Sequence, residues 1–80
     1  MKDSSLDKLD LHGVRHEKAR NLVIRRIEKL WGTDTDLEII TGHSPEMKNI
    51  VQKVLDEYSL EYEEGGWLKM NMGYVKTVVH

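Results

Sequence analysis

The chain contains no cysteine and no long apolar run. Without a thiol among its 80 residues, neither a disulfide scaffold nor a thiolate metal site can stabilise the fold. No segment approaches the roughly 20 apolar residues of a membrane-spanning helix, and residues 1–5 lack the apolar stretch of a signal peptide. A chain of this length must therefore fold by packing one small core. We expect a single cytoplasmic domain with no membrane partner.

Acidic and basic side chains nearly balance, but they are unevenly distributed. The formal net charge is -2, which argues against indiscriminate nucleic-acid binding. Residues 15–29 nevertheless carry six basic and two acidic side chains, so this segment has a charge of +4 and the rest of the chain −6. Such a segment is either a solvated helix face or a surface that follows phosphate groups. Charge alone does not distinguish the two.

Hydrophobic periodicity predicts the order strand, helix, strand, helix, strand, strand. We expect a flexible leader and then one domain, at residues 1–7 and 8–80. Apolar residues recurring every three or four positions predict helices at 17–31 and 45–58, and the second helix has Ser44 as a good N-cap and Pro45 as a good first residue. Alternating or β-branched segments predict strands at 8–12, 37–41, 60–64 and 74–79.

The path of residues 65–73 stays open at this point. Either these residues form a loop, or Gly65-Gly66 makes a tight hairpin turn into a further extended segment at 67–70.

This order of elements predicts an α/β (α+β) two-layer sandwich. Parallel strands joined by a helix cross over right-handedly, so both helices are expected on one face of a four-stranded mixed sheet. The other face stays open. Ligands in such sheets bind outside the carboxyl ends of the parallel strands, which here are residues 12–13 and 41–43.

The first of these ends carries an acid and an imidazole. Strand alternation places Leu9 and Leu11 on the helix-packed side, and Asp10 and His12 on the open face. An imidazole titrates near neutral pH and can act as acid or base in phosphodiester cleavage, with the neighbouring carboxylate orienting it. The alternative is that Asp10 caps a turn or pairs with a lysine and that His12 is structural. The residues alone favour this alternative.

The same stretch carries a family resemblance. Residues 9–13, with Glu17 and Ala19 on the following helix and residues 37–42 before a second amphipathic helix, resemble the Smr (small MutS-related) domain. The resemblance extends from about Leu9 to Val79. It implies a fold similar to the C-terminal domain of translation initiation factor three and an endonuclease activity on RNA or DNA, and relatives also occur in ribosome-associated nucleases. Asp10 and His12 match the family's Asp-x-His motif, which shifts the balance towards catalysis.

The chain departs from the family at the second strand end. Gly42 matches the first glycine of a Gly-x-Gly loop, but Ser44 replaces the second glycine, and the loop before the helix is short. Near the end of the chain only Gly73 carries over from a glycine-rich motif. The alternative function is therefore a nucleic-acid- or ribosome-binding module that has lost turnover. A third hypothesis is an interaction domain with no nucleic-acid role.

The candidate site joins both loops and both helix starts. The candidate catalytic residues are Asp10, His12 and His43. Free backbone amides at the second helix start offer an anion site, and the candidate nucleic-acid-binding residues are Gly13, Arg15, His16, Lys18, Gly42, Ser44, Lys48 and Gly73. No metal site is predicted because no close-spaced ligand set occurs, although Mg²⁺ or Mn²⁺ stays open as a cofactor. The sequence does not indicate an oligomeric state.

Overall fold

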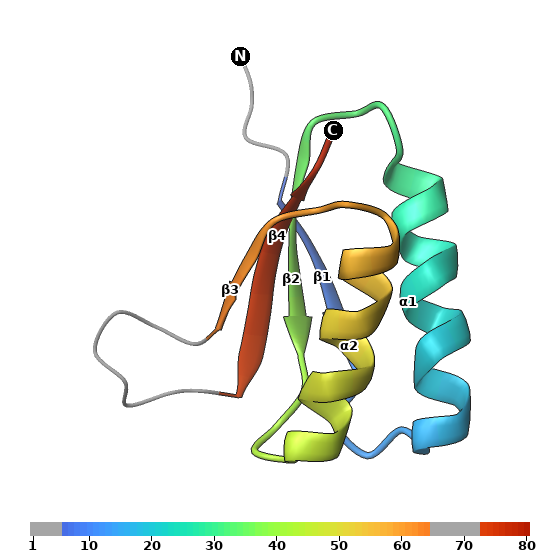
Figure 1. Ribbon diagram of the computed structural model, residues 1–80, viewed down its shortest axis with the longest axis vertical. Helices are drawn as coiled ribbons and strands as arrows, with labels where there is room; N and C mark the ends of the chain where they lie inside the picture. The colour runs from blue at the N-terminus through green and yellow to red at the C-terminus, as the bar shows by residue number, and fades with distance from the viewer. Residues whose placement is uncertain (1–5, 65–72) are drawn as a thin grey trace.

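The protein folds into two layers, a four-stranded sheet and a pair of helices (Figure 1). The structure, a computed structural model, describes residues 6–64 and 73–80. Its elements in chain order are β1 (Leu6–Asp10), α1 (His16–Leu30), β2 (Thr35–Ile40), α2 (Pro45–Glu57), β3 (Tyr62–Glu64) and β4 (Tyr74–Val79). The predicted two-layer α+β sandwich is confirmed.

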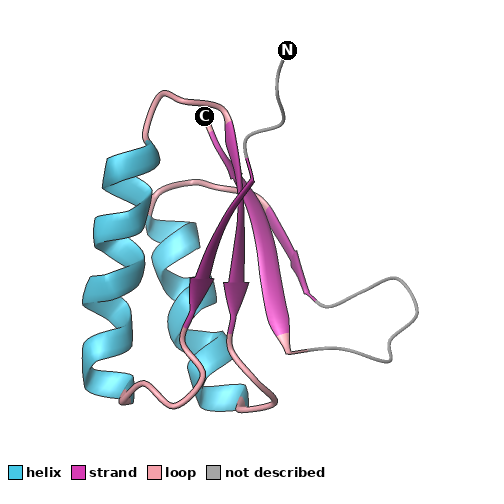
Figure 2. Ribbon diagram, turned by 180° about the vertical axis from the view of Figure 1, so that it is seen from behind, coloured by secondary structure: helices cyan, strands magenta, loops and turns pink. Residues whose placement is uncertain are grey.

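The sheet is mixed, with strand order β1-β2-β4-β3. Strands β1 and β2 pair in parallel, with Leu9 opposite Ile39. Strand β4 runs antiparallel to both of its neighbours, β2 and β3. Both helices lie on the same side of the sheet, and no helix of the described residues lies on the opposite face (Figure 2). The parallel pair therefore has its two carboxyl ends at one edge of the molecule, where both helices begin.

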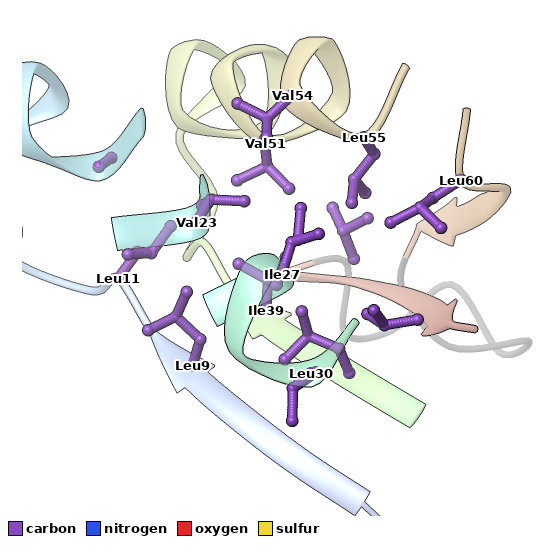
Figure 3. Close-up of a cluster of buried hydrophobic side chains, with 14 of the residues drawn as sticks. Leu9, Leu11, Val23, Ile27, Leu30, Ile39, Val51, Val54, Leu55 and Leu60 are labelled. Carbon is purple, nitrogen blue, oxygen red and sulfur yellow. The ribbon is translucent and has the colours of Figure 1, made fainter. Parts of the chain in front are cut away.

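Buried side chains of the strands and of the helices form one hydrophobic core between the two layers. The largest fully buried side chains include Leu11 and Ile39 from the sheet side and Ile27 and Leu55 from the helices. Figure 3 shows these side chains pointing into the space between the helices and the sheet. Leu9 and Leu11 are buried, whereas Asp10 and His12 are exposed, as the alternation predicts. The core thus fixes which side chains of the first strand remain accessible.

Three of the four strands have boundaries that differ from those predicted, and β2 begins at Thr35 and ends at Ile40 rather than at residues 37 and 41. Strand β1 begins at Leu6, two residues before the predicted start, because Leu6 pairs with β2 opposite Asp36 and Asp7 forms an ion pair with Arg26 of α1. These two residues had been assigned to the leader. Strand β1 also ends at Asp10 rather than at residue 12, because a turn follows directly.

Strand β3 begins at Tyr62, later than the predicted residue 60. Ser59 adopts a left-handed conformation with φ 58°, and the N–H of Leu60 donates to the Leu55 carbonyl at 2.9 Å. Leu60 therefore belongs to the turn that ends α2 and is buried there. The hairpin considered at residues 65–66 and the segment 67–70 lie outside the described residues.

Ion pairs tie α1 to its neighbours. Arg20 donates two hydrogen bonds to the Glu57 carboxylate of α2, at 3.1 and 2.7 Å. The hydrogen bond from Arg20 lowers the pKa of Glu57 below its ordinary value. On the other side of α1, Arg26 pairs with Asp7 and donates to the Lys8 carbonyl at 3.0 Å. Half of the six cations of residues 15–29, counting Arg15, are therefore engaged within the fold.

Neither of the two described helices is long and apolar enough to cross a membrane.

Candidate functional site

The carboxyl ends of β1 and β2 lie side by side. Asp10 is opposite Ile40 in the parallel pair, and the N–H of Leu11 extends the pairing by donating to the Ile40 carbonyl at 2.8 Å. The turn after each strand leads directly into a helix, and both helices begin at this end of the molecule (Figure 1). Residues 12–16 and 41–44 therefore contribute to one surface, although α1 and β2 separate them in the sequence.

The turn after β1 is held by the side chain of Asp10. Its Oδ1 accepts a hydrogen bond from the backbone N–H of His12 at 2.9 Å. The turn closes where the N–H of Val14 donates to the Leu11 carbonyl at 3.0 Å, and Gly13 occupies the left-handed region with φ 82°. Asp10 thus caps a turn, which was one of the alternatives considered from the sequence.

The imidazole of His12 is exposed at this turn. Within residues 6–64 and 73–80, it has no hydrogen-bond or ion-pair partner, and the Asp10 carboxylate binds the backbone of His12 rather than its ring. The ring is therefore accessible to a ligand, and Asp10 positions it through the main chain.

The ring of His12 lies close to the turn that follows β2. A Cβ built on Gly42 would be 3.6 Å from Cδ2 of His12, which is ordinary van der Waals contact. Gly42 has φ 70°, a conformation that residues with a side chain rarely adopt. The glycine matched by the family resemblance is therefore favoured by the conformation of the turn, whereas a methyl group at this position would fit beside His12. His43, which is exposed, follows it directly.

A third segment closes the site from the side of β4. The carbonyl of Gly73 accepts hydrogen bonds from the N–H groups of Thr41, at 2.7 Å, and Gly42, at 3.0 Å. The hydroxyl of Thr41, a buried residue, donates to the Gly42 carbonyl at 2.9 Å. Sequence reasoning selected Gly73 but not the supporting role of Thr41. The only signal for Thr41 was a hydroxyl residue at the end of an apolar strand.

The start of α2 is capped by Ser44. Its Oγ accepts a hydrogen bond from the Met47 N–H at 3.2 Å, which confirms the predicted N-cap. Ser44 has φ −77°, so this position does not need the conformational freedom of glycine. The expected anion site of free amides is corrected in part, because the N–H groups of Gly42 and Met47 already donate within the protein.

The cationic candidates divide between two surfaces. Arg15 and His16 lie at the start of α1 and line a shallow hollow with Gly13, next to the His12 turn. Arg15 also forms an exposed ion pair with Glu17 at 3.7 Å. Lys48 instead lines a separate hollow on α2, together with Glu64. The structure therefore groups the residues of α1 with His12 and places Lys48 on another surface.

The donor set does not fit a metal centre built from three side chains. No group of three or more His, Asp or Glu side chains in the described part of the chain is placed to hold a metal ion, and the catalytic candidates Asp10, His12 and His43 do not form one.

Comparisons of the chain with family models, curated protein sequences and solved structures found no match. The support for a function is therefore the site itself. It consists of an accessible imidazole, a glycine turn close to the ring, and two further exposed histidines, His16 and His43, at the same end of the molecule.

Proposed function

We propose that this protein binds nucleic acid at the carboxyl ends of β1 and β2 and cleaves a phosphodiester bond there. The observation that carries the proposal is the proximity of the exposed His12 ring to the Gly42 turn, which brings two separate motifs together in one site. The resemblance to the Smr domain supports the same location, because it rests on Asp10, His12 and Gly42. Under this proposal, Asp10 is a positioning residue that holds His12 through the backbone.

RNA is the substrate best matched to this site. The 2′-hydroxyl of RNA is a built-in nucleophile, so cleavage requires an acid–base pair but no metal-bound water. His12 accepts the proton of the 2′-hydroxyl as this oxygen bonds to the adjacent phosphorus. The bond from phosphorus to the 5′-oxygen then breaks, and a protonated second imidazole, for which His43 is the candidate, donates a proton to the leaving oxygen. The products are a 2′,3′-cyclic phosphate end and a 5′-hydroxyl end.

A second candidate function is nucleic-acid binding without cleavage. The observation favouring it is that the Asp10 carboxylate binds a backbone N–H, so within the described residues no carboxylate is hydrogen-bonded to the His12 ring. The surface would be the same, and only the turnover would differ. Cleavage and binding must therefore be measured separately.

The test uses labelled RNA and DNA oligonucleotides, each with Mg²⁺ and with a chelator. We expect cleavage of RNA under both conditions and a cyclic phosphate on the 5′ fragment. His12→Ala should slow cleavage by about 100-fold or more, the usual contribution of an acid–base group, and should leave the affinity for RNA nearly unchanged. His80→Ala is the matched control, because His80 is also exposed but pairs with Asp34 instead of lying at the site.

Three outcomes would contradict the proposal in different ways. Equal cleavage by His12→Ala and the wild type would show that the active site lies elsewhere. Binding of RNA by the wild type without cleavage would favour the non-catalytic module. The absence of salt-dependent binding to either nucleic acid would favour an interaction domain with no nucleic-acid role.

A further inference from the structure

The cations of α1 and its N-cap form two groups. Arg15, Arg20 and Arg26 each have an acidic partner in the fold. Lys18, Arg25 and Lys29 have none among residues 6–64 and 73–80, and all three are exposed. Half of the positive charge of this segment is therefore left without a partner in the described structure.

The three unpaired cations share one face of α1. They are seven and four positions apart, so at 3.6 residues per turn they lie within about 40° of one another around the helix axis. The buried positions Ala19, Val23, Ile27 and Leu30 point in another direction, into the core. With a rise of 1.5 Å per residue, the row from Lys18 to Lys29 is about 16 Å long. We call these three residues the α1 cation row.

The row begins beside the proposed site and leads away from it. Lys18 lies in the first turn of α1, directly after Glu17, which lines the hollow next to the His12 turn together with Arg15 and His16. A strand of nucleic acid with one phosphate at His12 would therefore have its neighbouring phosphates within reach of α1.

The opposite edge of the molecule has the opposite charge. β3 and the turn before it carry Glu61, Glu63 and Glu64, and β3 is the edge strand farthest from β1 in the sheet order. α1 and β3 lie on opposite sides of the molecule in both Figure 1 and Figure 2. A polyanion is therefore attracted to the α1 side and repelled from the β3 side.

From these observations we infer that the α1 cation row binds the phosphate backbone of the RNA that the site cleaves. This inference rests on the proposed function. A lipid surface fits less well, because an interfacial helix inserts an apolar face, and the apolar face of α1 is buried in the core. An acidic protein also fits less well, because protein interfaces are centred on apolar and aromatic side chains and are depleted in lysine.

The test compares two triple variants that remove the same charge. Lys18→Gln/Arg25→Gln/Lys29→Gln removes the row, and Lys8→Gln/Lys53→Gln/Lys76→Gln removes three cations from β1, α2 and β4. Affinity for a labelled oligouridylate with methylated 2′-hydroxyls, which cannot be cleaved through these oxygens, is measured by fluorescence anisotropy at increasing NaCl concentration, after circular dichroism has shown that both variants are folded. Log affinity should fall less steeply with log salt in the row variant, with the magnitude of the slope reduced by about 2. Each phosphate contact on a single strand contributes about 0.7 to this magnitude, and the variant removes three cations.

The control variant should change this slope by less than about 0.7, which is the contribution of one phosphate contact. An unchanged slope in the row variant, or an equal decrease in the control, would overturn the inference while leaving cleavage at His12 intact. Failure of the wild type to bind RNA would instead overturn the proposed function and, with it, the role of the row. Equally strong, row-dependent binding to phosphatidylserine vesicles or polyglutamate would show a general polyanion surface and would also overturn the inference.

Discussion

The imidazole of His12 lies close to Gly42, since a Cβ added at Gly42 would be 3.6 Å from the Cδ2 atom of the ring. The end of the first parallel strand is therefore near the turn that follows the second. This turn has φ 70° at Gly42, a conformation that favours glycine. The second half of the proposed site therefore depends on this residue for its geometry.

Gly42→Ala should destabilise the protein by about 1–2 kcal/mol, the cost of a left-handed conformation for a residue with a side chain. Crowding adds little, because the new methyl group would only just touch His12. Urea unfolding measures the stability, and RNA cleavage measures the effect on the site. Gly32→Ala is the matched control, since Gly32 has φ 84° and no atom within 4 Å of an added Cβ. A fully stable Gly42→Ala variant would contradict the role of this turn.

Asp10 can be tested by separating its hydrogen bond from its charge. Asp10→Ala removes the acceptor for the His12 N–H and should cost about 1 kcal/mol of stability. Asp10→Asn keeps an acceptor oxygen and should remain near wild-type stability, with RNA cleavage within a few-fold of the wild type and an unchanged pH profile. If Asp10→Asn instead lost cleavage as completely as His12→Ala, the carboxylate would act in the reaction itself rather than through the turn.

The pair Arg20–Glu57 predicts a pH dependence of stability. The hydrogen bond and charge of Arg20 lower the pKa of Glu57 in the folded protein, so the unfolded chain takes up a proton at Glu57 at a higher pH than the folded one. This contribution to stability is fully present above the ordinary glutamate pKa and is lost as the pH falls through the lowered value. Because both side chains are about half exposed, the effect should be small and should weaken with salt.

The measurement for this pair is the urea midpoint at neutral and at acidic pH. The wild type should lose more stability between the two than Arg20→Gln, which lacks the partner that lowers the pKa of Glu57. Arg25→Gln serves as the control, because it removes the same charge from α1 without breaking an ion pair found among the described residues. An equal acid sensitivity in the wild type and Arg20→Gln would show that the pair contributes nothing measurable.

Short-range patterns in the sequence were sufficient to predict β4 and the start of α2. The β-branched run of β4 marked Tyr74–Val79 at both ends, and Ser44 with Pro45 marked the start of α2. Chain order and crossover handedness then placed both helices on one face of the sheet. These features could be predicted because each depends on neighbouring residues or on topology alone.

Tertiary contacts determined what the sequence could not show. Leu6 and Asp7 belong to β1 because β2 and Arg26 contact them, and nothing in the local pattern indicates either partner. The same applies at the site. The resemblance indicated Asp10 and His12, and a turn capped by Asp10 was one of the alternatives from the sequence, but the two hydrogen bonds to the Gly73 carbonyl depend on the folded geometry.

The hydrogen bond from Arg26 to the Lys8 carbonyl has a consequence for contacts between molecules. β1 is an edge strand, and the N–H of Leu11 points towards β2, so by alternation the Lys8 carbonyl points away from the sheet. An unpaired carbonyl on such an edge is a template on which another extended chain can add and begin aggregation. The Arg26 side chain occupies this carbonyl from α1, so at Lys8 the acceptor is no longer free to pair with a second molecule.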